Sequence, residues 1–103
     1  MKQIKCLVKD IRDEMEGAEH YAKLAVQYKD TDKALADTYA KMSEAELGHV
    51  DLLHAQAVRL IKEQRAAGVE APAAMQAVWD WEHEQQIDTV ARIRALLDSY
   101  KRQ

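Results

Sequence analysis

The sequence predicts an all-α protein in which one domain is built from three long amphipathic helices. Apolar residues recur at helical spacing along almost the whole chain, charged residues make up 32% of the 103 residues and lie between them, and only 3 Gly and 1 Pro interrupt the pattern. No alternation of apolar and polar residues competes as a strand signal. We therefore expect helices over about residues 3–28, 32–67 and 72–100, within a single domain of residues 1–103.

Turn chemistry marks the two boundaries between these helices. The segment Asp30-Thr-Asp-Lys supplies N-cap residues for the second helix. Gly68 is expected to end that helix, and Pro72 suits the first turn of the third. Because both connections are short, consecutive helices should run antiparallel, as a hairpin followed by a third long helix.

Charge and the N-terminal residues exclude several classes of partner. The formal net charge is −3, and the basic residues are scattered, which argues against a nucleic-acid surface. The N-terminal Met-Lys-Gln-Ile-Lys-Cys reaches charge again at Lys9, so neither a signal peptide nor a membrane span is indicated. We expect a cytoplasmic protein with no membrane or nucleic-acid partner.

Three polar side chains interrupt the apolar seams of the first two helices. The seven-spaced rows of the second helix are Leu35, Met42, His49, Gln56 and Tyr39, Glu46, Leu53, Leu60. Glu46 and His49 are therefore expected to point inward, and Glu14 takes the place of an apolar residue in the corresponding row of the first helix. An unpaired buried carboxylate is costly, so such residues normally have a partner charge or a metal.

The spacing of the two carboxylates indicates a metal site. Glu14 lies as many residues before a turn centred near Asp30 as Glu46 lies after it, so the two should be level across the hairpin. Facing buried carboxylates repel each other unless a cation lies between them. His49, one turn along, adds a nitrogen ligand. This oxygen-rich set with one imidazole suits iron or manganese better than a structural zinc ion.

The same residues allow a reading without a metal. A Glu-x-x-His pair often arises by chance, and it gains weight here because Glu46 and His49 fall on the seam at the depth of Glu14. The alternative is a non-catalytic helical adaptor, in which a buried polar cluster fixes the register and association state of the helices. Metal content measured together with oligomeric state distinguishes the two readings.

The motifs resemble those of the ferritin-like family, especially its rubrerythrin and encapsulated-ferritin branches. Glu14 with Tyr21 resembles the Glu-x6-Tyr of the first helix in that family, and Glu46 with His49 resembles the Glu-x-x-His of the second. The resemblance covers about residues 8–61. A ferritin-like di-iron site takes a Glu from each of two helices and a Glu-x-x-His from each of two others. This chain has one of each, so the resemblance implies that a homodimer, or a higher homo-oligomer, completes the four-helix-bundle site.

The resemblance also implies a function. The protein would bind iron and oxidise Fe(II) to Fe(III) with dioxygen or peroxide at the di-iron centre, as a ferroxidase-type oxidoreductase acting in iron storage or detoxification. Tyr21 would support a ligand carboxylate, and manganese or zinc would be possible substitutes for iron. A chain of 11.8 kDa cannot enclose a mineral cavity. Storage would therefore need a large homo-oligomer or a shell, and the C-terminal residues 97–103 do not look like an encapsulin cargo-loading peptide.

The third helix offers one further candidate ligand, Glu82. No Tyr follows it seven residues later, so the third helix does not repeat the first. A turn near Val69 places Glu82 opposite residue 56, about 15 Å along the helix from Glu46. This register favours a paired polar residue over a metal ligand, with ligation across a subunit interface as the alternative.

Some of the remaining residues near these motifs carry weaker expectations. His20 and His54 fall off the seams and are expected at the surface or at an interface, and His83 is expected to be solvated. Gly17 and Gly48, inside helices, are each unfavourable by about 1 kcal/mol relative to Ala. Their presence indicates a close helix approach near the site.

Overall fold

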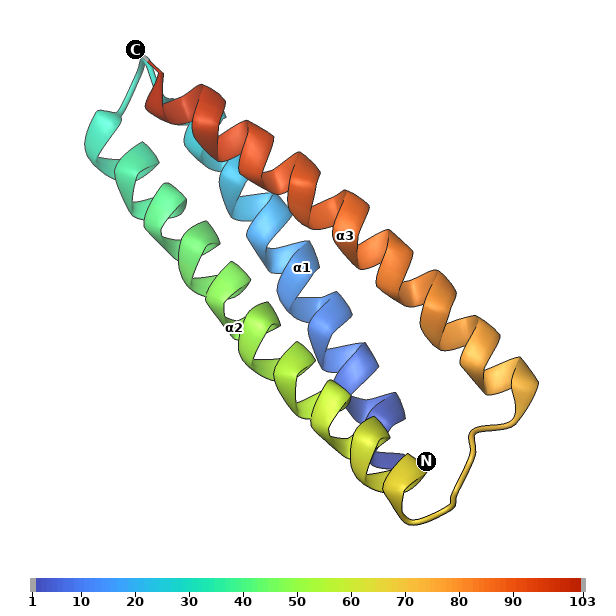
Figure 1. Cartoon of the computed structure of the whole chain (residues 1–103). Helices are drawn as coiled ribbons and strands as arrows, with labels where there is room; N and C mark the ends of the chain where they lie inside the picture. Colours follow the sequence, from blue (N-terminus) through green and yellow to red (C-terminus); the bar gives the residue numbers. More distant parts are fainter. Residues whose placement is uncertain (1, 103) are drawn as a thin grey trace.

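The computed structural model describes residues 2–102 and contains three long helices (Figure 1). They are α1 (Lys2–Tyr28), α2 (Lys33–Ala66) and α3 (Ala73–Lys101). No strand occurs within residues 2–102, so the all-α class is confirmed, and each helix begins and ends within one residue of the expected range. No helix in this part of the chain has a stretch apolar enough to cross a membrane.

Local hydrogen bonds and backbone geometry explain where the helices begin and end. The Asp32 carboxylate accepts a hydrogen bond from the Leu35 amide at 3.1 Å and so caps the N-terminus of α2. Gly68 has a φ of +79°, which favours glycine, and the chain leaves the helical path there. Pro72 precedes α3. As a result α2 runs antiparallel to α1, and α3 returns parallel to α1 (Figure 1).

Small side chains fill the centre of the bundle near the first turn. The buried residues there include Ala18, Ala22, Ala25, Ala36, Ala40 and Ser43. The hydroxyl of the fully buried Ser43 donates a hydrogen bond to the Ala18 carbonyl at 2.7 Å, which joins α2 directly to the backbone of α1. Because the distance between packed helices depends on the side chains at their contact, these residues let α1 and α2 approach closely.

The buried residues differ by one position from the expected rows on α2 and in the row of α1 that contains Glu14, whereas the other expected row of α1 is buried at Ile11, Ala18 and Ala25. On α2 the buried row is Ala36, Ser43, Val50 and Ala57, with Ala40 and Leu47 beside it. Glu46 is therefore half-buried and His49 is exposed, so the expectation that they point into the core is wrong. On α1, Met15 and Ala22 are buried, while Glu14 and Tyr21 are half-buried. The physical reason is that α1 and α2 pack closely, so only small side chains fit between them and the larger apolar side chains lie at the edges of the contact.

Candidate metal centre

Glu14, Glu46 and His49 come together at the edge of the contact between α1 and α2. One potential ligand atom from each lies within 4.8 Å of the other two. The His49 Nδ1 atom is 3.4 Å from the Glu14 Oε2 atom, so the cluster joins the two helices. The side chain of His49 is 52% exposed and that of Glu14 is 31% exposed. Within residues 2–102, no other three His, Cys, Asp or Glu side chains offer ligand atoms this close together.

Gly17 of α1 lies beside the side chain of Glu46. A Cβ atom at Gly17 would lie 3.5 Å from the Glu46 Oε2 atom, which is ordinary van der Waals contact. An Ala side chain would therefore fit at Gly17, and this contact does not require glycine. A Cβ atom at Gly48 would meet nothing within 4 Å, so the expectation of a close helix approach is wrong for Gly48 in this chain.

The cluster lies on the side of the α1–α2 pair that faces away from α3. Arg12 of α1 and Glu44 of α2 each form an ion pair with a residue of α3. Each stands two residues before a cluster member, and two residues correspond to about 200° around a helix. Glu14 and Glu46 therefore project from the opposite face, which α3 does not cover.

Apolar and aromatic side chains share this open face with the cluster. The half-buried members of the same helical rows are Leu7, Tyr21, Tyr28, Tyr39, Leu53 and Leu60. Met42, also in these rows, is 38% exposed. A solvated helix face is usually covered by charged side chains, whereas this face has apolar side chains around a polar centre. The open face thus combines the polar cluster with partly exposed apolar side chains.

Tyr21 is part of an aromatic stack beside the cluster. Its ring centroid is 6.0 Å from that of Tyr39, which lies 6.1 Å from that of Tyr28. Tyr21 stands two turns, about 10 Å along the helix, from Glu14. The structure shows no hydrogen bond between Tyr21 and a cluster carboxylate among the described residues, so the supporting role expected for Tyr21 stays a prediction.

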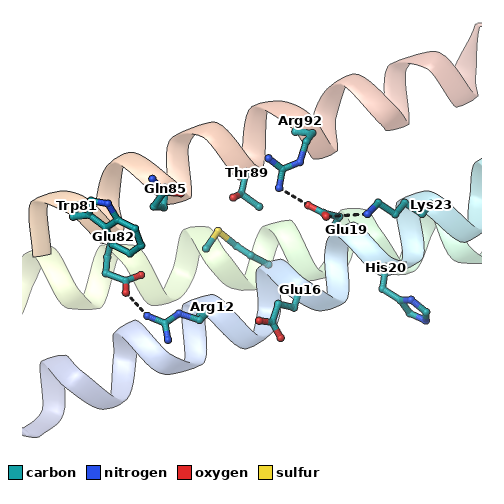
Figure 2. Close-up of a pocket in the computed structure, with 11 residues that line it drawn as sticks. Arg12, Glu16, Glu19, His20, Lys23, Trp81, Glu82, Gln85, Thr89 and Arg92 are labelled. Carbon is teal, nitrogen blue, oxygen red and sulfur yellow. Dashed lines mark hydrogen bonds and ion pairs between the residues drawn. The ribbon is translucent and has the colours of Figure 1, made fainter. Parts of the chain in front are cut away.

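Glu82 is not brought to the cluster. Figure 2 shows it in the groove between α1 and α3, where its carboxylate pairs with the Arg12 guanidinium. The side chain of Glu82 is only 16% exposed. The structure thus shows the paired polar residue that the register favoured. The pairing, on the face of α1 opposite Glu14, keeps Glu82 away from the proposed metal ligands.

Two histidines, His54 and His83, lie in a contact that the sequence analysis did not predict. His54 and His83 stack between α2 and α3 with ring centroids 5.1 Å apart, and Trp79 lies 6.2 Å from His83. Both rings are half-buried. The expected solvation of His83 is therefore wrong, and His54, expected at the surface or at an interface, lies in a contact between two helices of the same chain. The missed signal is periodicity, because His54 follows the buried Leu47 by seven residues.

The donor types at the cluster fit an oxygen-preferring transition metal. Two carboxylates and one imidazole are ligands that iron and manganese accept, whereas a structural zinc site would be closed by four donors, usually including Cys. Comparisons with protein-family models, curated proteins and solved structures find no match for this chain. The fold and site together define a three-helix chain with a Glu–Glu–His cluster on an open face.

Proposed function

We propose that the chain is half of a ferritin-like di-iron protein that binds Fe(II) and oxidises it to Fe(III) between two subunits. The observation that carries this proposal is the convergence of Glu14, Glu46 and His49 on a face that α3 leaves open. A two-fold contact over this face would place two copies of each donor around one centre. Four carboxylates and two imidazoles are the ligand set of ferritin-like di-iron sites.

The surroundings of the cluster support a homodimer. An α1–α2 pair from a second copy would complete a four-helix arrangement and cover the apolar rows on either side of the donors. In each subunit α3 would stay outside this bundle, since it packs on the opposite side of α1. A larger homo-oligomer could be built from such dimers, with detoxification or storage as the role.

The chain's own residues would bind, orient and shield the metal ions. Fe(II) would be the substrate: two ions held by these donors would supply two electrons, which with two protons would reduce dioxygen to hydrogen peroxide or hydrogen peroxide to water. Glu14 and Glu46 would balance the rising positive charge, while His49 supplies a neutral nitrogen. The apolar rows would limit the access of water. Manganese or zinc would occupy the same donors, and we place the activity in the cytoplasm.

Tyr21 is the residue to which we assign a supporting role. A helical side chain leans toward the N-terminus of its helix, which for Tyr21 is the direction of Glu14. Its stack on Tyr39 limits the freedom of the ring. A hydrogen bond from the Tyr21 hydroxyl would orient a ligand carboxylate, as partners of metal ligands commonly do.

The test compares Glu46→Ala with two matched carboxylate variants, Glu44→Ala and Glu82→Ala. Each protein is loaded anaerobically with Fe(II), exposed to dioxygen or peroxide, and followed by the near-ultraviolet absorbance of Fe(III). Glu46→Ala should abolish oxidation, because a half-buried ligand has no substitute within one turn. Glu44→Ala and Glu82→Ala should retain most of it, and circular dichroism should show folded helices in all three.

Two outcomes would count against the proposal. Undiminished oxidation in Glu46→Ala would refute the di-iron site itself. Equal and total loss in Glu46→Ala and Glu82→Ala would instead make α3 a ligand donor. The adaptor alternative makes a separate forecast: no iron retained after anaerobic loading and desalting, and no loss of oligomer on chelation.

A further inference from the structure

α3 is anchored unevenly along its length. Its buried residues, Ile93, Leu97 and Tyr100, all lie in its C-terminal half. There the Tyr100 hydroxyl also donates a hydrogen bond to the Asp37 carboxylate of α2. No residue in the range 73–90 is buried. The N-terminal half of α3 is therefore held by partly exposed side-chain contacts, with no fully buried residue of its own.

Two of these contacts involve titratable groups. One is the ion pair between Arg12 of α1 and Glu82. The other is the stack of His54 on His83, in which the rings are nearly parallel at 16°. The His54 Nε2 atom is buried and has no hydrogen-bond partner within residues 2–102. A proton added at this nitrogen would have no acceptor, and it would put a positive charge next to a second imidazole.

The groups that face the stack come from all three helices. On α2, Asp51 stands one turn before His54 and favours its protonation. On α3, His83 disfavours the protonation of His54, and Glu82 is held in an ion pair with Arg12. The α1 side chains that line the same small cavity as His83 are apolar: Val8, Ile11 and Met15.

The net effect of this environment is to disfavour the charged form of His54. Burial lowers the pKa of His54 below its ordinary value of 6.5, and His83 lowers it further against the opposing effect of Asp51. When α3 moves away, the imidazole regains its ordinary pKa. Well above pH 6.5 the imidazole is neutral in both states and docking is unaffected. As the pH falls below 6.5, His54 binds a proton more readily in the undocked state than in the docked state, so docking weakens. The weakening stops once the pH is below the lowered pKa of docked His54, because His54 is then protonated in both states.

We propose that the His54–His83 stack is a pH-sensitive latch, and that residues 73–90 of α3 loosen from α1 and α2 as the pH falls from neutral toward about 5. The buried residues of the C-terminal half keep the remainder of α3 in place, so the opening is local. It exposes Trp79 and the surface of α2 around His54. The latch lies away from the metal cluster and does not depend on metal binding.

The test follows α3 while the pH is lowered from about 8 to about 5. In a Trp81→Phe background the fluorescence reports Trp79, whose emission should shift to longer wavelength as the latch opens. Amide hydrogen exchange, corrected for its intrinsic pH dependence, should accelerate several-fold in residues 73–90 and much less in residues 93–101. No response to pH, or equal acceleration in both halves, would overturn the proposal.

Variants and a direct titration separate the latch from other acid effects. The double variant His54→Phe with His83→Phe keeps two rings at the contact but cannot gain charge, so its pH response should disappear. His20→Gln, which removes an exposed histidine of α1, should respond like the unaltered chain. The same response in the double variant would contradict the latch. If that variant does not fold, nuclear magnetic resonance titration of His54 in the unaltered chain decides: a pKa at or above 6.5 overturns the proposal.

Discussion

Replacing Ile93 by Ala should destabilise the chain far more than the same change at Ile87 on the same helix. Ile93 is fully buried where α1, α2 and α3 meet, whereas Ile87 is 57% exposed. Removing three buried carbons from Ile93 loses about 2.4 kcal/mol of transfer free energy. A cavity that the neighbours only partly fill adds up to about 2 kcal/mol. We expect a total loss of about 3–4 kcal/mol in the free energy of unfolding.

The control at Ile87 should be close to neutral. Less than half of the transfer term applies at this exposure, which leaves about 1 kcal/mol. The better helix propensity of Ala offsets up to about 0.5 kcal/mol of that loss. Urea unfolding followed by circular dichroism, at one fixed protein concentration and with the slope m compared among variants, measures both changes. Similar losses at Ile93 and Ile87 would refute the packing assigned to α3.

Two further predictions follow from contacts near the first turn. The Tyr100 hydroxyl, followed by Lys33, holds the pKa of Asp37 below its ordinary value of 3.8. Tyr100→Phe should therefore lower the melting temperature at neutral pH. The difference from the unaltered chain should shrink as the pH falls below 3.8, because the Asp37 carboxylate becomes protonated. A difference that is constant with pH would contradict the hydrogen bond from Tyr100 to Asp37. Ala18→Leu should overpack the small-residue seam, cost about 1–3 kcal/mol and weaken metal binding by parting Glu14 from Glu46. Isothermal titration with Mn(II) measures that binding, and unchanged affinity in a destabilised Ala18→Leu would show that the seam does not position the cluster.

The sequence predicted the helices well because local chemistry determines their ends. Asp32 caps α2 through its own side chain, Gly68 adopts a positive φ, and Pro72 stands at the N-cap position just before α3. The meeting of Glu14 with Glu46 was also predictable. Their equal distance from a single tight turn fixes their depth, whichever face of the pair they occupy.

Burial was predicted less well, because a seven-residue repeat does not show whether the large or the small apolar residues lie between two closely packed helices. Counting Leu, Met and Tyr as core placed Glu46 and His49 inside, while the structure buries the smaller Ala36, Ala40 and Ser43. The side on which α3 packs was likewise not encoded in a local motif. Because α3 packs against the face of α1 that carries Arg12, Glu82 of α3 pairs with Arg12 and does not reach the open face.

The measurement that tests the central claim most directly is an anaerobic Fe(II) titration performed together with sedimentation velocity across a range of protein concentrations. If two copies complete the site, iron binding should saturate at two ions per two chains and should favour the dimer, because metal shared between chains promotes association by mass action. Both effects should be lost in His49→Ala, while the helical content remains. A monomer that keeps full iron binding at high dilution would contradict a site formed between two subunits.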